Sequence, residues 1–287
     1  MRLALALLLV GCVGTMPPAP TRPAPTRHVG PVTAIVGGGA FACSQAGVEA
    51  HERFFALPFR AVGLALVGDD LLVVGGVPGE RGEVALCDAN GGVSAQVALG
   101  ADLIYAVAAP AGRGECIVGC ADGAVHVLAL PTLAPLRELV RHNAPCVAIA
   151  ADPDGQQFAT AGRDGIVHLY TVPDYAHVEL ADHQDGVGCL LFTADGLWSG
   201  ARDGRVRLHR GDRLVRSYPE QRSAIVALRV CGERVVAGSC DGALLELDRR
   251  RSAVREIGRV APLFALDWAD DGGLLLGVTG GVERFQN

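Results

Sequence analysis

The sequence predicts an all-β fold, a seven-bladed β-propeller of four-stranded antiparallel blades. Three observations favour it: a turn motif that recurs at about the length of one blade, a second set of turns in step with the first, and the lack of a convincing amphipathic helix. Half of the 287 residues are apolar but only 5% are aromatic, so Val, Leu, Ala and Ile must build the core. The 38 glycines suit many short strands joined by tight turns.

The first set of turns consists of a small residue, a variable residue and Asp-Gly, followed by an apolar alternation typical of a strand. The clearest copies contain Asp122-Gly123, Asp164-Gly165, Asp203-Gly204 and Asp241-Gly242. Their glycines are 42, 39 and 38 residues apart. This spacing agrees with the period of about 40–45 residues expected for one four-stranded blade. Weaker copies that end at Gly47, Gly82 and Gly281 bring the predicted number of blades to seven.

The second set of turns would join the first and second strands of a blade. It comprises Asp154-Gly155, Asp195-Gly196, Gly232-Glu233 and Asp271-Gly272. Asp-Gly favours a tight hairpin turn because glycine accepts a positive φ at no steric cost. The segment nearest to a helical pattern, residues 47–59, falls where a third strand is due.

These repeats resemble those of the WD-repeat (WD40) family. A blade of that family often carries a His before its first strand, a Ser or Thr in the second, an Asp in the turn before the third and a Trp in the third, and these four side chains form a buried hydrogen-bond network. The residues that match are His142, Thr160, Asp164 and Tyr170 in blade four, His183, Ser199, Asp203 and His209 in blade five, and the Asp alone, Asp122 and Asp241, in blades three and six. The Trp-Asp dipeptide that names the family is absent, so period and turns carry the resemblance.

Ser199, His183 and Asp203 also have the composition of a hydrolase triad. A triad needs an exposed nucleophile, a base in contact with it and an oxyanion site. The resemblance instead implies that these groups are buried within one blade. We therefore expect them to stabilise the fold and not to catalyse a reaction.

Closure of the ring is predicted to involve the N-terminus. The last blade offers three strands, at residues 263–268, 274–278 and 282–285, before the sequence ends. Propellers of the resembled family commonly take the missing outer strand from the opposite end of the chain. The candidate is the segment 20–27, in which Pro23 and Pro25 are compatible with an edge strand.

The first 19 residues carry a targeting signal. Arg2 precedes an apolar run from Leu3 to Val10, which is too short to span a bilayer and is typical of a signal-peptide core. Leu9-Val10-Gly11-Cys12 resembles the bacterial lipobox, whose Cys is lipid-modified. We expect residues 1–19 to be a signal-like segment with a Pro-rich tether, residues 20–287 to form the propeller, and Cys12 to anchor a lipoprotein in the cell envelope. If translation starts at Met16, the protein is instead cytoplasmic.

The composition favours a protein partner. The net charge of −6 is acidic, so we expect no nucleic acid, and contact with a membrane only through Cys12. In the resembled family, partners bind the face that holds the turn before the third strand, where Arg163 and Arg202 precede the turn Asp. Arg222 lies in the loop before blade six. Our hypothesis is that these three arginines contribute to an interface for an acidic partner.

The alternative function is a propeller enzyme, such as a lactonase or dehydrogenase, with a metal or cofactor in the central channel. Such a site needs acidic, His or Asn side chains that converge from several inner strands. The predicted inner strands are apolar and small, as in Cys146-Val147-Ala148-Ile149 and Ile225-Val226-Ala227-Leu228. The sequence lacks a pair of Cys-x-x-Cys motifs for zinc. We therefore predict no cofactor, no metal and no enzymatic activity.

Overall fold

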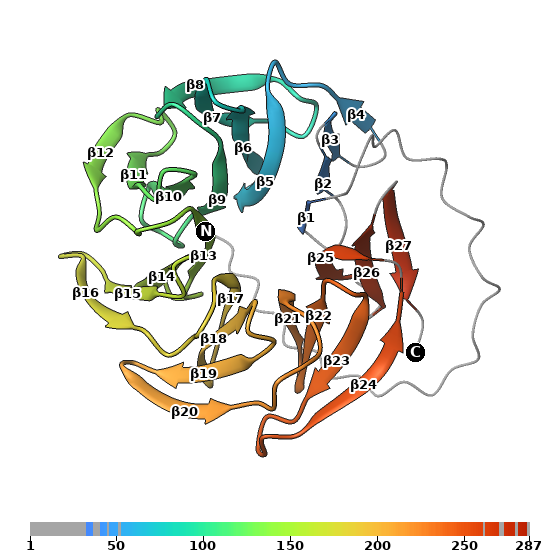
Figure 1. The fold of residues 1–287 in the computed structure, drawn as a ribbon. Coiled ribbons are helices and arrows are strands. Elements are labelled where there is room, and N and C mark those ends of the chain that lie inside the picture. Colours follow the sequence, from blue (N-terminus) through green and yellow to red (C-terminus); the bar gives the residue numbers. More distant parts are fainter. Residues whose placement is uncertain are drawn as a thin grey trace, which may run out of the picture.

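The computed structural model describes residues 33–36, 41–44, 46–50, 53–260, 262–269, 273–278 and 281–285. Seven antiparallel sheets stand around a central axis (Figure 1). Six sheets have four strands, and the seventh has three strands within the described residues. The predicted seven-bladed β-propeller is therefore confirmed.

Each sheet is one blade, and its strands follow chain order from the centre of the ring outward. Blade 1 contains β1 (Ala34–Val36), β2 (Phe41–Ser44), β3 (Gly47–Ala50) and β4 (Arg53–Phe55). Blade 2 contains β5 (Arg60–Val67), β6 (Asp70–Val77), β7 (Arg81–Cys87) and β8 (Val93–Leu99). Blade 3 contains β9 (Ile104–Ala108), β10 (Glu115–Cys120), β11 (Val125–Ala129) and β12 (Pro135–Glu138).

The second half of the ring repeats this arrangement. Blade 4 contains β13 (Cys146–Ala151), β14 (Gln157–Gly162), β15 (Val167–Thr171) and β16 (Ala176–Leu180). Blade 5 contains β17 (Val187–Thr193), β18 (Gly196–Ala201), β19 (Val206–Arg210) and β20 (Arg213–Ser217). Blade 6 contains β21 (Ile225–Cys231), β22 (Arg234–Ser239), β23 (Ala243–Leu247) and β24 (Val254–Arg259). Blade 7 contains β25 (Leu263–Trp268), β26 (Leu274–Val278) and β27 (Gly281–Phe285).

The core lies between the blades. Trp198 of blade 5 is fully buried, stacks on Tyr218 and belongs to one apolar cluster with Leu228 and Leu245 of blade 6. The inner strands also contact one another in chain order, and β1 contacts both β5 and β25. Because every sheet packs on two neighbours, the blades bury both of their faces and the ring closes.

Each Asp-Gly turn lies against the loop that follows the outer strand of the same blade. Gly123 has a φ of 86° and Gly204 a φ of 73°, a conformation that glycine adopts without strain. A Cβ atom at Gly123 would lie 2.2 Å from the His142 carbonyl oxygen, and one at Gly204 would lie 2.4 Å from the Gln221 carbonyl oxygen. Only glycine lets the loop approach this closely, so the turn motif fixes the position of the loop that follows the outer strand.

Several predictions about the N-terminal half of the chain lie outside the described residues. These are the segment 1–19 with Cys12 and the predicted borrowed strand at 20–27. The turn Asp271-Gly272 between β25 and β26 also lies outside them. In the described part of the chain, no helix has the length and apolar character needed to cross a membrane.

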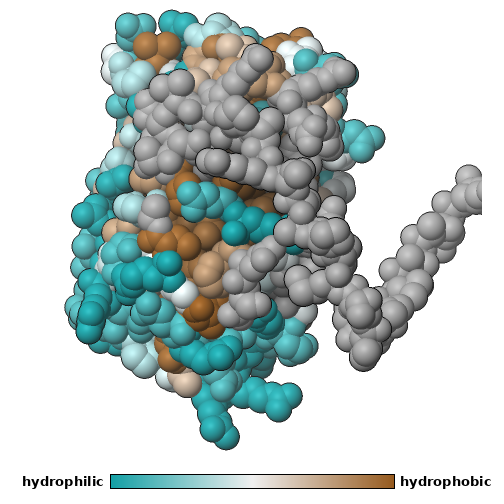
Figure 2. All heavy atoms as spheres, turned by 90° about the vertical axis from the view of Figure 1, so that its right-hand side faces the viewer, coloured by the Kyte–Doolittle hydropathy of each residue, from teal (hydrophilic) through white to brown (hydrophobic). Residues whose placement is uncertain are grey.

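Blade 7 shows where a fourth strand would add. Its three strands match the three predicted segments, with β27 starting one residue earlier. The outer edge of β27 pairs with none of the described strands. Figure 2 shows that apolar side chains reach the surface in the middle of the side of the molecule that carries this blade.

If residues 20–27 supply the fourth strand of blade 7, deletion of residues 1–27 should lower the melting temperature by at least about 5 °C, because the blade would then lose its outer strand. Thermal melts followed by circular dichroism measure this effect. A chain that lacks only residues 1–19 is the control, since it keeps the segment 20–27. If the two truncated chains melt together, the borrowed strand is wrong.

Candidate protein-binding face

One end of the ring carries the turns between second and third strands and the loops that lead into the inner strands. We call it the turn face and define it by turns 121–124, 163–166, 202–205 and 240–242 and loops 100–103, 139–145, 181–186 and 218–224. The same backbone contact recurs there. The amides of Arg163, Arg202 and Cys240 donate to the carbonyl of the residue before the inner strand, at 2.9, 2.8 and 2.9 Å. The residue before the turn Asp or Asp-Gly therefore occupies the same position on the turn face in each of these blades.

In blade 4, His142 links the loop to the turn. Its Nδ1 lies 3.2 Å from Asp164 Oδ2, and its Nε2 lies 3.0 Å from Thr160 Oγ1. Asp164 also accepts the amides of Asn143, at 2.9 Å, and Ile166, at 3.2 Å. Burial lowers the pKa of His142, so the imidazole is neutral at neutral pH. A neutral ring supplies one donor, for the carboxylate, and one acceptor, for the Thr160 hydroxyl.

Tyr170, which the resemblance placed in this network, lies outside the hydrogen-bonded set. Its ring stacks on Phe158 with the centroids 4.8 Å apart, and its buried hydroxyl makes no hydrogen bond of normal geometry with the described residues. The ring that approaches His142 belongs to His168, at 4.7 Å between centroids. Tyr170 therefore contributes packing at this position.

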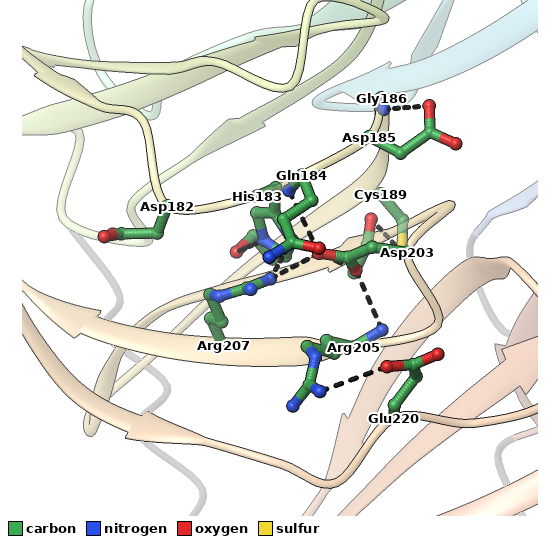
Figure 3. Close-up of polar contacts among 12 residues, drawn as sticks. Asp182, His183, Gln184, Asp185, Gly186, Cys189, Asp203, Arg205, Arg207 and Glu220 are labelled. Atoms are coloured by element: carbon green, nitrogen blue, oxygen red, sulfur yellow. Dashed lines mark hydrogen bonds and ion pairs between the residues drawn. The ribbon is translucent and has the colours of Figure 1, made fainter.

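In blade 5, His183 makes the same two contacts, with the turn Asp and with a hydroxyl of the second strand. Figure 3 shows His183 beside Asp203 and Arg207. The Nδ1 of His183 lies 3.2 Å from Asp203 Oδ2 and its Nε2 lies 2.7 Å from Ser199 Oγ. Arg207 adds a buried cation whose Nη1 donates to Asp203 Oδ2 at 2.8 Å and contacts His183 Nδ1. His209, in contrast, bonds Asp182 at 2.6 Å and lies outside this set.

Charge and burial set the protonation of this group. Burial, then the Arg207 charge, lowers the pKa of His183 to about 4. Burial opposes ionisation of Asp203, but hydrogen bonds from Arg207 and the Arg205 amide outweigh it and lower the pKa of that carboxyl. The group at neutral pH is thus a carboxylate, a guanidinium and a neutral imidazole. Sequence reasoning missed Arg207, although it stands four residues after the turn Asp, as His168 does in blade 4.

Ser199, His183 and Asp203 have the connectivity of a catalytic triad but not its accessibility. Ser199 is 1% exposed, and so is the side chain of His183. A nucleophile must meet its substrate and an oxyanion site. A substrate could reach Ser199 only if the blade opened, so these contacts serve the fold.

Blades 3 and 6 neutralise the turn Asp with arginine. Asp122 pairs with Arg141 at 2.9 Å, and Asp241 pairs with Arg259 at 2.7 Å. Both carboxylates are partly exposed, with 49% and 36% of the side chain accessible, so they are not part of a buried network. A hydrogen bond from Ser239, then one from Arg259, lowers the pKa of Asp241 to about 2. In a blade without the His, the turn carboxylate is therefore paired with an arginine from the outer strand of the same blade or from the loop that follows it.

The three arginines of the binding hypothesis are all exposed. Among the described residues, no carboxylate lies within 4.0 Å of Arg163 or Arg222, and Arg202 only approaches Asp185, at 3.9 Å. Such an exposed, distant pair contributes little stability. The structure thus leaves these three cations available at the turn face.

Blade 6 also carries a basic run, the arginines at positions 249, 250, 251, 255 and 259, and three of these five have acidic partners. Arg249 pairs with Asp195 at 2.6 Å and with Glu233 at 3.3 Å. Arg255 pairs with Glu246. As described above, Arg259 pairs with Asp241. This run is therefore largely neutralised within the chain.

Within the part of the chain that the structure describes, no group of three His, Cys, Asp or Glu side chains is arranged to hold a metal ion. Cys116 and Cys120 are buried and free, and burial raises the pKa of both thiols to about 12. Cys240 is exposed and lies 2.9 Å from the Ser223 hydroxyl.

Comparison with known proteins gives a partial match. The family described as WD domain, G-beta repeat matches residues 133–171 and 176–210. These residues cover blade 4 and most of blade 5, where His142 and His183 make their contacts. The chain is thus a seven-bladed β-propeller whose fourth and fifth blades are similar to WD repeats.

Individual proteins show local similarity. THO complex subunit 3 of Arabidopsis thaliana is 44% identical over 52 residues, which are 18% of this chain and 16% of that protein. Telomerase protein component 1 of Rattus norvegicus is 32% identical over 129 residues, which are 42% of this chain and 5% of that protein. The chain thus spans a minor part of both relatives.

A solved structure shows the fold alone. The crystal structure of the computationally designed Ika8 protein superposes with a TM-score of 0.67 and 18% sequence identity, covering 91% of this chain and 97% of that one.

Proposed function

We propose that this chain is a non-catalytic scaffold whose turn face binds an acidic segment of a partner protein through Arg163, Arg202 and Arg222. One observation carries the proposal. Among the described residues, these three exposed guanidinium groups lack a close carboxylate partner, whereas Arg141 and Arg205 of the turn face, and Arg259 next to it, are paired at 2.9, 3.1 and 2.7 Å. Arginine is enriched at binding hot spots because its planar fork can hold a carboxylate through two hydrogen bonds.

The fold supports a scaffold more than an enzyme. The groups that resemble a triad are buried, and the inner strands present small apolar residues such as Val147 and Val226. A rigid ring with loops at its end needs no chemistry of its own to hold a partner. The matched relative named as a subunit of the THO complex is itself part of an assembly, by its name.

Changing Arg163, Arg202 and Arg222 together to Glu should reduce capture of the partner by at least about 100-fold, because three attractive contacts become repulsive. Affinity capture from the native host, with mass spectrometry, measures this loss and identifies the partner. The proteins that depend on the arginines should contain clusters of Asp and Glu.

The chain offers a matched control for this experiment. Arg213, Arg250 and Arg251 are also exposed, and they lie at the turns between third and fourth strands, at the opposite end of the ring. Changing those three to Glu alters the net charge equally but should leave capture intact. If both triple variants capture the same proteins as the unchanged chain, the arginines of the turn face are not an interface.

A further inference from the structure

The outer strand of blade 2, β8, is the least protected edge among the described strands. It has seven residues, Val93–Leu99, and none of them is charged or a proline. The outermost described strand of every other blade is shorter and contains at least one Arg or Glu. The outer edge of β8 pairs with none of the described strands, and Figure 1 shows β8 on the outer rim of the ring. Proteins usually guard such an edge with charges, proline or a short strand, so β8 is open to pairing with a further strand.

The two faces of β8 differ in burial. Ala95, Val97 and Leu99 are partly buried and pack on the apolar cluster between blades 2 and 3. Gln96 and Ala98, on the other face, are exposed. The register with β7 is regular from Ala95 to Leu99. A strand added outside β8 would therefore continue a regular sheet that is apolar on one face and polar on the other.

Both ends of β8 carry a carboxylate that lacks a basic partner. Asp88, in the turn that leads into β8, accepts two backbone amides at 2.7 and 2.9 Å. Asp102, just beyond the other end, also accepts two backbone amides, and these bonds, the first of them from Gly79, lower the pKa of its carboxyl. Among the described residues, no basic side chain lies within 4.0 Å of either carboxylate, and Arg81 bonds Glu83 instead. The edge is thus neutral along its length and negative at its two ends.

We propose that β8 pairs with an extended segment of another protein that is uncharged over the length of β8 and carries Lys or Arg at both ends. In this mode of recognition, main-chain hydrogen bonds along a sheet edge supply the affinity. The basic residues of the segment would lie against Asp88 and Asp102, so the charges of the two partners are complementary. This edge is separate from the arginines of the turn face, and the proposal does not rest on the function proposed above.

A second copy of this chain fits the edge less well. A two-fold symmetric contact pairs the two β8 strands antiparallel, which would bring Asp88 of one copy toward Asp102 of the other. Like charges that face each other across an interface oppose association. A contact between two single strands is also small compared with the roughly 1,200 Å² that a stable protein interface buries.

Three fluorescein-labelled peptides test the proposal on the full-length chain. The first alternates Val and Thr over the length of one strand and has two lysines at each end. The second is the same peptide with N-methyl groups on its middle amides, and the third has Gly and Ser in place of the Val-Thr core. Fluorescence anisotropy should show that the first peptide binds at least about ten-fold more tightly than the other two, because only it can form the main-chain hydrogen bonds of a strand.

Variants of the chain locate the site. Ala98→Lys places a charge on the exposed face of β8 and should weaken binding of the first peptide at least about ten-fold. Its matched control is Ala176→Lys, which alters an exposed alanine of the outer strand β16 and should leave the affinity unchanged. Asp88→Asn combined with Asp102→Asn should lower the affinity about three-fold and reduce its dependence on salt. Thermal melts verify that each variant is folded.

Three results would overturn the proposal. Equal binding of the first peptide and its N-methylated form would exclude strand pairing, and equal binding to the Ala98→Lys and Ala176→Lys chains would place the peptide elsewhere. Equal binding of the Gly-Ser peptide would reduce the interaction to attraction between charges. Analytical ultracentrifugation tests the occupant, since we expect the unchanged chain to be monomeric. A dimer that Ala98→Lys dissociates would show that β8 binds a second copy instead of a basic segment.

Discussion

Asp203→Ala is expected to lower the free energy of unfolding by about 3–5 kcal/mol, the cost of leaving a buried cation without its partner. The Arg207 guanidinium is 7% exposed and donates to Asp203 at 2.8 Å, and His183 lies against the same carboxylate. Without Asp203, the charge of Arg207 stays in a site that water hardly reaches, beside an imidazole that burial already keeps neutral. Urea denaturation measures the change.

Two further variants, at Asp164 and Asp185, serve as comparisons for Asp203→Ala. Asp164→Ala in blade 4 should lower the free energy of unfolding by less, on the order of 2–3 kcal/mol. It leaves a neutral His142 and two backbone amides without their acceptor, but no buried cation. Asp185→Ala, at an exposed loop position 3.9 Å from Arg202, should change the stability by less than about 0.5 kcal/mol. Equal losses for Asp203 and Asp185 would show that the network contributes nothing.

Acidification should destabilise the protein between about pH 6.5 and pH 4. Burial, then the nearby charges of His142 and His177, lowers the pKa of His168 to about 4, and burial and Arg207 do the same for His183. The unfolded chain binds these protons near the ordinary histidine pKa of about 6.5, so it holds more protons than the folded chain across this interval. Stability is therefore complete above pH 6.5 and falls as the pH drops, by up to about 3 kcal/mol for each imidazole.

Melting temperatures at half-unit steps from pH 7.5 to pH 4 measure this loss. The variant His168→Gln removes one of the two groups and should flatten the slope in this interval. Carboxyls with a lowered pKa destabilise the protein mainly below their ordinary values, 3.8 for Asp203 and Asp241 and 4.5 for Glu246, so the change between pH 7 and pH 5 reports the imidazoles. A melting temperature that stays constant from pH 7 to pH 5 would contradict the neutral, buried imidazoles.

The architecture was predictable because its signal is local and repeated. An Asp-Gly turn with a φ near 80° restricts the backbone in four residues, and four such turns at one period leave few other folds. Turn, loop and inner strand then place His142 and His183 within reach of the turn Asp. The exposure of Arg163, Arg202 and Arg222 follows from the same positions.

The contacts of the turn Asp residues that could not be predicted from the sequence depend on strand register. Arg207 meets Asp203 because Ser199 pairs with Arg207 across two strands, and Arg141 and Arg259 reach their turn from the outer strand or the loop that follows it. A shift of one residue would send these side chains to the other face of the sheet, and composition does not fix that choice.

The boundaries of the matched repeats are staggered relative to the sheets. Residues 133–171 begin before β12, the outer strand of blade 3, and end with β15 of blade 4. Each of the two matched units therefore bridges two sheets, since residues 176–210 run from β16 of blade 4 to β19 of blade 5. A linear array of repeats can fray from a terminal member. A closed ring built from bridging units offers no such starting point, so unfolding should proceed as one cooperative event, and excision of a single unit would damage two sheets.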